Sequence, residues 1–150
     1  MTISDAAELK KLLKALGFEV YRTSIGRVLL AERVRDNLIM DSGIAVEPEG
    51  GYGSSANNVQ VSVTLRAQAS HFPGASVAQL QTEARALAKL LLDRGYSEDN
   101  SSGQEMLDPG DPTQVLDTSH ELQVSRLVSE QDLQAELRWL LKLPRSSTDD

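Results

Sequence analysis

The chain has 150 residues, of which 40% are apolar, so it is long enough for one globular domain with a substantial core. Its 15 basic and 22 acidic residues give a net charge of −7, which disfavours binding of the whole protein to nucleic acid or to anionic membranes. The absence of cysteine excludes disulfides, thiolate zinc sites and thiol nucleophiles, and is consistent with a reducing compartment.

The first predicted element is an amphipathic helix over residues 5–16. Its leucines recur at the spacing of one helix face, and lysines occupy the other faces. Ser4 or Asp5 can cap its start, and Gly17 supplies the left-handed residue that ends it. The leucines on this face are Leu9, Leu12, Leu13 and Leu16.

Three strands are predicted next, over residues 18–23, 27–34 and 37–48, with a bulge in the third near Ser42 and Gly43. The apolar residues of 27–34 scatter around a helical wheel, which argues against an amphipathic helix there. A helix that begins near Ser24 stays the alternative for residues 25–40. The small and turn-forming residues of 49–58 predict a loop.

Residues 59–70 show the clearest strand pattern, because apolar and polar residues alternate without a break from Val59 to Ser70. One face of this strand should lie on a core and the other on water or on a partner. A turn over 71–76 then leads into a helix at about 76–94, where Ser76 and Gln79 form a capping box and Gly95 ends the helix.

Residues 97–118 are rich in Asp, Ser, Gly and Pro, which predicts an exposed loop with at most a short strand around 104–107. A strand over 120–128 and a final helix at about 129–143 follow. The prediction is therefore an α+β fold, with an antiparallel or mixed sheet of four to six strands and three helices packed on it. We expect one domain over residues 1–145 and a flexible tail over 146–150.

Known catalytic and metal-binding patterns are missing. His71 and His120 are not in metal-ligand spacing, and the glycines of 50–55 lack the lysine of a phosphate-binding loop. The aspartates of 108–117 do not fit a calcium loop, and no G-x-S-x-G elbow occurs. We therefore predict no catalytic, cofactor-binding or metal-binding residues, and no enzyme activity.

Candidate interface residues come from three features: arginines concentrated between residues 22 and 35, a proline-stiffened segment at 108–112, and isolated large aromatics. A solvated strand face is the alternative reading of the arginines, and Trp139 could equally cover the sheet. The candidates are Arg22, Arg27, Arg33, Arg35, Tyr52, Arg66, Phe72, Asp108, Asp111, Arg126 and Trp139.

One arrangement is more specific than its parts. VQVSVTLRAQASHFPGASVAQLQTEARALAKLL is a strand, a short proline-containing turn and an Ala/Leu helix, and DPGDPTQVLDTSHELQVSRLV later supplies a strand that carries Arg126. This order resembles the tail-terminator and neck proteins (tail-completion and minor-capsid proteins) of tailed bacteriophages. The resemblance covers the organisation of roughly residues 1–128, and the helix at 129–143 is an addition to the simplest pattern.

The resemblance implies a structural role without a cofactor. Such proteins form a ring, often hexameric, that ends the tail tube and joins it to the head connector. The expected partners are further copies of the chain, tail-tube proteins and head-connector proteins, with no membrane and with nucleic-acid contact only at the lumen of a ring. The expected location is the bacterial host cytoplasm during synthesis and then the neck of the virion.

A second resemblance belongs to a different class of protein. GFEV after the first helix and LVSEQDLQAELRWLL near the end have loose counterparts in type III secretion chaperones and YbjN-like domains. The implied function is then a dimer that holds a segment of a client protein.

Overall fold

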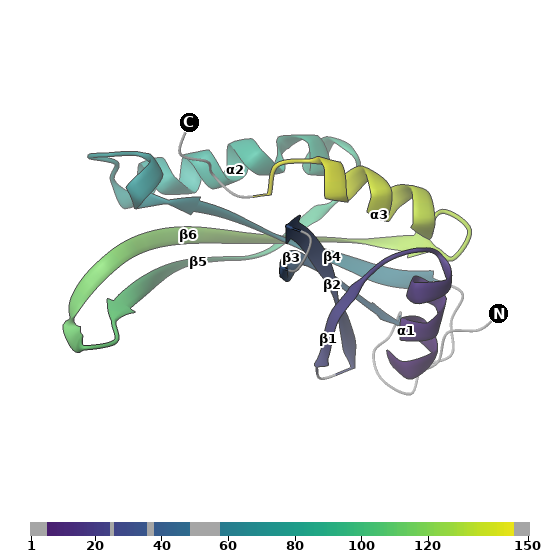
Figure 1. Cartoon of the computed structure of the whole chain (residues 1–150). Helices are drawn as coiled ribbons and strands as arrows, with labels where there is room; N and C mark the ends of the chain where they lie inside the picture. Colours follow the sequence, from purple (N-terminus) through teal and green to yellow (C-terminus); the bar gives the residue numbers. More distant parts are fainter. Residues whose placement is uncertain (1–5, 25, 36–37, 49–57, 146–150) are drawn as a thin grey trace. The chain divides into compact units, whose positions relative to one another are not determined.

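The computed structural model describes residues 6–24, 26–35, 38–48 and 58–145, and their elements form an α+β fold (Figure 1). Six strands make one antiparallel sheet in the order β1-β2-β3-β4-β6-β5. The elements are α1 (Ala6–Ala15), β1 (Val20–Ser24), β2 (Arg27–Arg35), β3 (Leu38–Pro48), β4 (Asn58–Gln68), η1 (Ala69–His71), α2 (Val77–Asp93), β5 (Ser97–Asp108), β6 (Asp111–Ser129) and α3 (Leu133–Lys142). The predicted fold class, with its N-terminal, central and C-terminal helices, is confirmed.

Contacts between Cα atoms divide the chain into two compact units. The first comprises residues 1–63 and 125–143, and the second comprises residues 64–124 and 144–150. Strands β4 and β6 contribute residues to both units. The prediction of a single domain over 1–145 stays a prediction, and the predicted tail at 146–150 lies outside the described residues.

The core of the first unit forms where α1 packs against β1, β2 and β3. Leu9 and Leu13 are fully buried, as the leucine spacing predicts, and Gly17 follows the helix at a φ of 98°. Strand β3 bulges where Leu29 pairs with Ala45 but Ala31 pairs with Asp41. The predicted bulge is therefore present, and Gly43 permits it at a φ of 81°. The helix considered for residues 25–40 is wrong, because β2 and β3 occupy the described part of that range.

Helix α3 completes the first unit. Leu133, Leu137 and Leu140 are fully buried on one helix face. The side-chain amide of Gln134 donates a 2.9 Å hydrogen bond to the carbonyl oxygen of Leu16 after α1. The helix begins at Leu133 rather than near 129, because Ser129 accepts a hydrogen bond from the Asp132 backbone and so closes a turn ahead of it.

The second unit contains the rest of β4, followed by α2 and most of the β5–β6 hairpin. The capping box predicted for α2 is present: Ser76 Oγ accepts from the Gln79 backbone, and the Gln79 side chain accepts from the Ser76 backbone. Helix α2 packs against β5. The apolar side chains buried in this unit are Leu65, Ala67, Leu80, Ala84, Ala88, Leu91, Tyr96, Leu122 and Val124.

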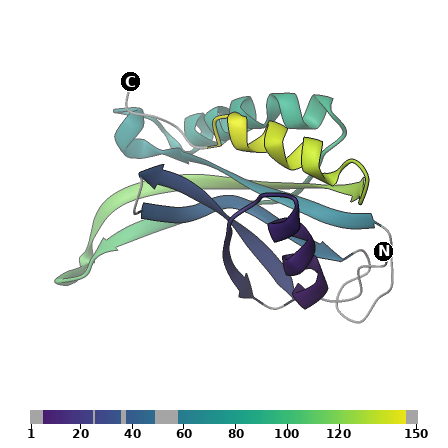
Figure 2. The ribbon, with the colours of Figure 1, turned by 45° about the vertical axis from the view of Figure 1, so that its right-hand side comes forward.

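The prediction of an exposed loop over residues 97–118 is wrong, because this segment forms β5 and the first part of β6. The two strands meet at a two-residue turn, Pro109–Gly110. In Figures 1 and 2 the strand ends that flank this turn extend away from α2 as a two-stranded arm. The segment carries no alternating pattern because almost every residue is exposed, so neither face needs apolar side chains.

Candidate functional site

The second unit carries a long exposed hairpin, the arm, defined here as residues 97–118. Its apolar side chains are half exposed: Met106 at 55%, Leu107 at 45%, Val115 at 49% and Leu116 at 56%. An isolated two-stranded hairpin is marginally stable in water, and covering its exposed apolar side chains would stabilise it. The arm therefore has the properties of a segment that another surface covers.

Side chains fix the turn at the end of the arm. Asp108 Oδ1 accepts a 2.8 Å hydrogen bond from the Gly110 backbone. Asp111 Oδ1 accepts from both the backbone and the hydroxyl of Thr113, at 3.1 and 2.6 Å. Both hydrogen bonds lower the pKa of the Asp111 carboxyl, and the bond from the Thr113 hydroxyl has the larger effect. The turn therefore holds the side chains of Asp108 and Asp111 in a defined geometry.

A second set of hydrogen bonds holds the base of the arm to the end of β4. Asp117 accepts from the Ser70 hydroxyl at 2.8 Å, from the Ser70 backbone at 3.1 Å and from the Thr118 backbone at 2.9 Å. Burial on its own would raise the pKa of Asp117, but these hydrogen bonds and the nearby His71 outweigh it, so the pKa is lowered. The Asp117 carboxylate thus connects the arm to the segment that leads into α2.

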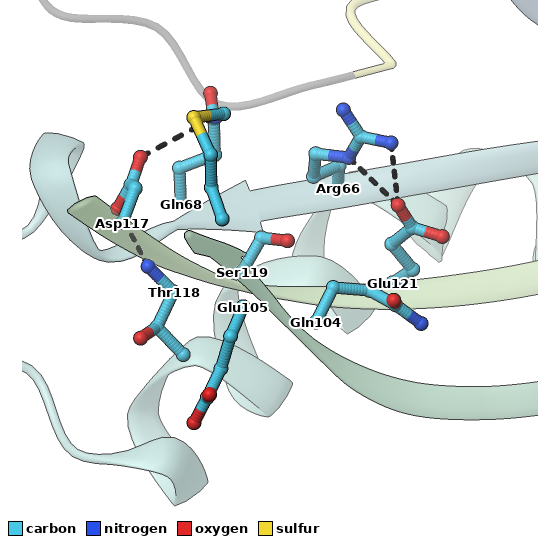
Figure 3. A pocket seen from close by; sticks show the side chains of 9 residues that line it. Arg66, Gln68, Gln104, Glu105, Asp117, Thr118, Ser119 and Glu121 are labelled. Atoms are coloured by element: carbon cyan, nitrogen blue, oxygen red, sulfur yellow. Dashed lines mark hydrogen bonds and ion pairs between the residues drawn. The ribbon is translucent and has the colours of Figure 1, made fainter. Parts of the chain in front are cut away.

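A hollow of about 210 Å³ lies between β4 and the base of the arm (Figure 3). Its charged groups are partly paired, since Arg66 Nε donates to Glu121 Oε1 at 2.9 Å. Pockets for small ligands usually measure about 300–1,000 Å³ and have apolar walls. The lining residues are Arg66, Gln68, Gln104, Glu105, Met106, Asp117, Thr118, Ser119 and Glu121. The hollow is therefore too small and too polar for a typical cofactor site.

The pair Ser101 and His120 is the described arrangement nearest to catalytic chemistry. Ser101 Oγ lies 2.5 Å from Nε2 of His120, which is 4% exposed. The Nδ1 atom of His120 has no hydrogen-bond partner among the described residues, so the carboxylate that would orient a catalytic base is missing there. Neither residue lines the hollow. This geometry fits a part-buried structural contact between β5 and β6.

The predicted interface arginines lie in the first unit, on β1 and β2. Arg22 is exposed, with its guanidinium carbon 6.0 Å from the centre of the Tyr21 ring. Arg27 is half-buried, and its Nε has no hydrogen-bond partner among the described residues. Arg33 forms a 2.7 Å ion pair with Glu19. Arg35 ends β2, and its side chain lies outside the described set.

The other candidates are scattered through the chain. Arg66 lines the hollow, and Phe72 is half-buried after η1. Asp108 and Asp111 flank the turn of the arm. Tyr52 lies outside the described residues. The structure thus places four of the candidates, Arg66, Phe72, Asp108 and Asp111, in the second unit.

Arg126 and Trp139 belong to the first unit. Arg126 Nη1 donates a 3.3 Å hydrogen bond to Glu136, a buried carboxylate on α3. Trp139 lies on the same helix and is partly exposed. Arg126 therefore holds β6 to α3, which is a role inside the unit.

Sequence reasoning missed the apolar residues of the arm. Met106–Leu107 and Val115–Leu116 are two adjacent apolar pairs, one before and one after Pro109–Gly110. A Pro-Gly dipeptide marks a turn, and a hairpin turn there predicts a strand on either side of it. This was the signal in the sequence that the interpretation as a loop overlooked.

No protein-family model, curated protein or solved structure matches this chain. Within the described residues, no cluster of three metal-binding side chains occurs. The helices of that same part of the chain are all too short or too polar to cross a membrane.

Proposed function

We propose that this protein is a structural assembly protein of a phage-like particle, which forms a ring at the head–tail junction, ends the tail tube and joins it to the head connector. The observation that carries the proposal is the arm, whose two strands are exposed at nearly every residue from 97 to 116. A hairpin without its own core gains stability when a neighbouring subunit covers it. Long exposed hairpins are therefore expected in proteins that act as parts of an assembly.

The strand order supports the same proposal. Strands β1 and β5 are the two edges of the sheet, and edge strands offer backbone groups to a further chain. The polar hollow beside β4 supports a role without small-molecule chemistry, because Glu121 already pairs with its arginine. The proposed partners are further copies of the chain, tail-tube proteins and head-connector proteins.

Native mass spectrometry of the purified full chain, combined with negative-stain electron microscopy, tests the proposal. The expected result is a ring with the mass of about six chains, as the resemblance to tail-terminator proteins implies. A stable dimer that binds an unfolded client polypeptide would contradict the ring and would favour the chaperone-like alternative.

Location within a particle gives an independent test, because some ring proteins assemble only beside their partners. Antibodies against the chain would be applied to phage-like particles released by the organism that encodes it. Label at the junction of head and tail is the expected result. Intact tailed particles without label at that junction would overturn the proposed role.

A further inference from the structure

The two edges of the sheet carry opposite charge. The arm, which includes the edge strand β5, has six acidic residues between positions 97 and 118 and no lysine or arginine. The other edge belongs to what we call the basic segment, residues 6–35 with α1, β1 and β2. It has seven lysines and arginines against three glutamates, although the whole chain has a net charge of −7. Such segregation of charge is typical of surfaces that attract each other.

Three of these charges, those of Arg22, Arg27 and Glu105, have no ion-pair partner among the described residues. Other charges on these segments do form ion pairs: Arg33 pairs with Glu19, and Glu98 at the start of β5 pairs with Arg85. Charge therefore remains available on both edges.

Exposed apolar groups accompany the charge on each edge. On the arm, Met106, Leu107, Val115 and Leu116 are each about half exposed. On β1, Tyr21 is 42% exposed and lies beside Arg22. Tyrosine and arginine are enriched at the centres of interfaces, where they contact apolar and acidic groups together. The two edges thus carry opposite charges, and each also exposes apolar groups that the other can cover.

We propose that the acidic arm of one copy docks on the basic β1–β2 hairpin of a second copy, with β5 beside the edge strand β1. This inference rests on the proposed ring-forming function and names the contact through which the ring would close. Contact between two β5 strands is disfavoured because it would place acidic residues against acidic residues. An interface between two different surfaces of the same chain is heterologous, and such interfaces generate rings when the rotation closes.

Cross-linking between copies tests the position of the contact. Because the chain has no cysteine, single cysteines can be introduced without background. An untagged Leu107→Cys protein and a size-tagged Thr23→Cys protein would be mixed and treated with a flexible bis-maleimide. Both replaced residues are exposed, and Thr23 lies on β1. The expected product is a covalent heterodimer. The matched control replaces Thr23→Cys by Ala86→Cys on the exposed face of α2 and should give none.

Charge reversal tests the chemistry of the contact. Arg22→Glu and Glu105→Arg should each weaken self-association by about tenfold or more in sedimentation velocity, because each puts like charges together. The double variant should recover most of the loss. Lys89→Glu, an exposed change on α2, is the matched control and should have little effect. Raising the salt from about 0.05 to 0.5 M should weaken association of the wild-type chain as well.

The outcomes separate this inference from the proposed function. A ring that gives no Leu107–Thr23 cross-link, or that ignores both charge reversals, overturns the inference and leaves the ring in place. A cross-linked closed dimer supports the arm contact and overturns the ring. A third protein would carry both Leu107→Cys and Thr23→Cys, and cross-links that form only within its single chains would overturn the inference. A chain that never self-associates would overturn it too.

Discussion

Strands β4 and β5 have almost the same length, 11 and 12 residues, and opposite surroundings. In β4 the side chains from Val59 to Ala67 alternate into a core that buries them completely, whereas β5 is exposed at nearly every position. Apolar and polar residues alternate along a strand when one of its faces packs on a core. Strand β4 therefore reads clearly from its sequence, while β5, which has no such face, reads as a loop. The same difference predicts that mutations in the two strands act on different properties.

The largest expected effect on stability comes from comparing a leucine-to-alanine change in β4 with one in the arm. Leu65→Ala in β4 removes a fully buried side chain and should lower the free energy of unfolding by about 2–5 kcal/mol, through lost burial and the cavity left behind. Leu116→Ala in the arm removes a side chain that is 56% exposed and should change the free energy of unfolding by less than about 0.5 kcal/mol. Urea denaturation followed by circular dichroism measures both. Equal losses would show that the arm belongs to the same core as β4.

Matched glycines separate the bulged strand from the arm. Gly43→Ala puts a side chain at a φ of 81° and should cost about 1–2 kcal/mol of stability. Gly103→Ala in β5 has room, because the nearest atom to its new Cβ would be the carbonyl oxygen of Ser119 at 4.0 Å. That change should be neutral or stabilise by up to about 1 kcal/mol, since alanine restricts the unfolded chain. A destabilising Gly103→Ala would mean that β5 needs glycine there.

Local features of the sequence predicted the elements that bury a face. The leucine spacing of α1, the capping box of α2 and the bulge at Gly43 each follow from rules that operate within a few residues. The error fell on residues 97–118, where aspartate and proline signals of a turn were extended over β5 and the first part of β6. Pro109 and Gly110 do form the turn, and Pro112 is tolerated near the start of β6.

The candidate surface was predicted only in part. Arg22, Arg27, Asp108 and Asp111 were singled out from composition, and they lie on the β1–β2 hairpin and on the arm, which the further inference joins. Arg126 was singled out in the same way, but its partner Glu136 lies ten residues on, inside α3. Spacing along the chain does not tell whether an arginine meets a carboxylate of its own fold. That information requires the tertiary structure.

Acid should loosen the connection between the arm and β4. The pKa of Asp117 lies below its ordinary value of 3.8 in the folded chain, so the unfolded chain binds a proton first as the pH falls. The stability that Asp117 contributes is therefore present above about pH 4 and is lost as the pH drops through its lowered pKa. Urea denaturation at pH 7 and pH 3 should show a smaller loss for Asp117→Asn than for the wild type. Ser70→Ala, which removes one donor, should give an intermediate loss, and an unchanged loss in both variants would contradict this role.

The smallest effect on global stability is expected at the turn of the arm, where Asp111→Ala removes the two hydrogen bonds from Thr113. These bonds are exposed, so the midpoint of urea denaturation should barely move. Local opening of the arm should become more frequent, because the arm has no core of its own that would oppose the opening. Amide hydrogen exchange followed by mass spectrometry should show faster exchange over residues 100–116 in the variant, with β4 unchanged. In the wild-type chain the same amides should become protected as the concentration rises and neighbouring copies cover the arm, whereas β4 should be protected at every concentration. An arm already protected as strongly as β4 in dilute monomer would remove the difference between these two strands.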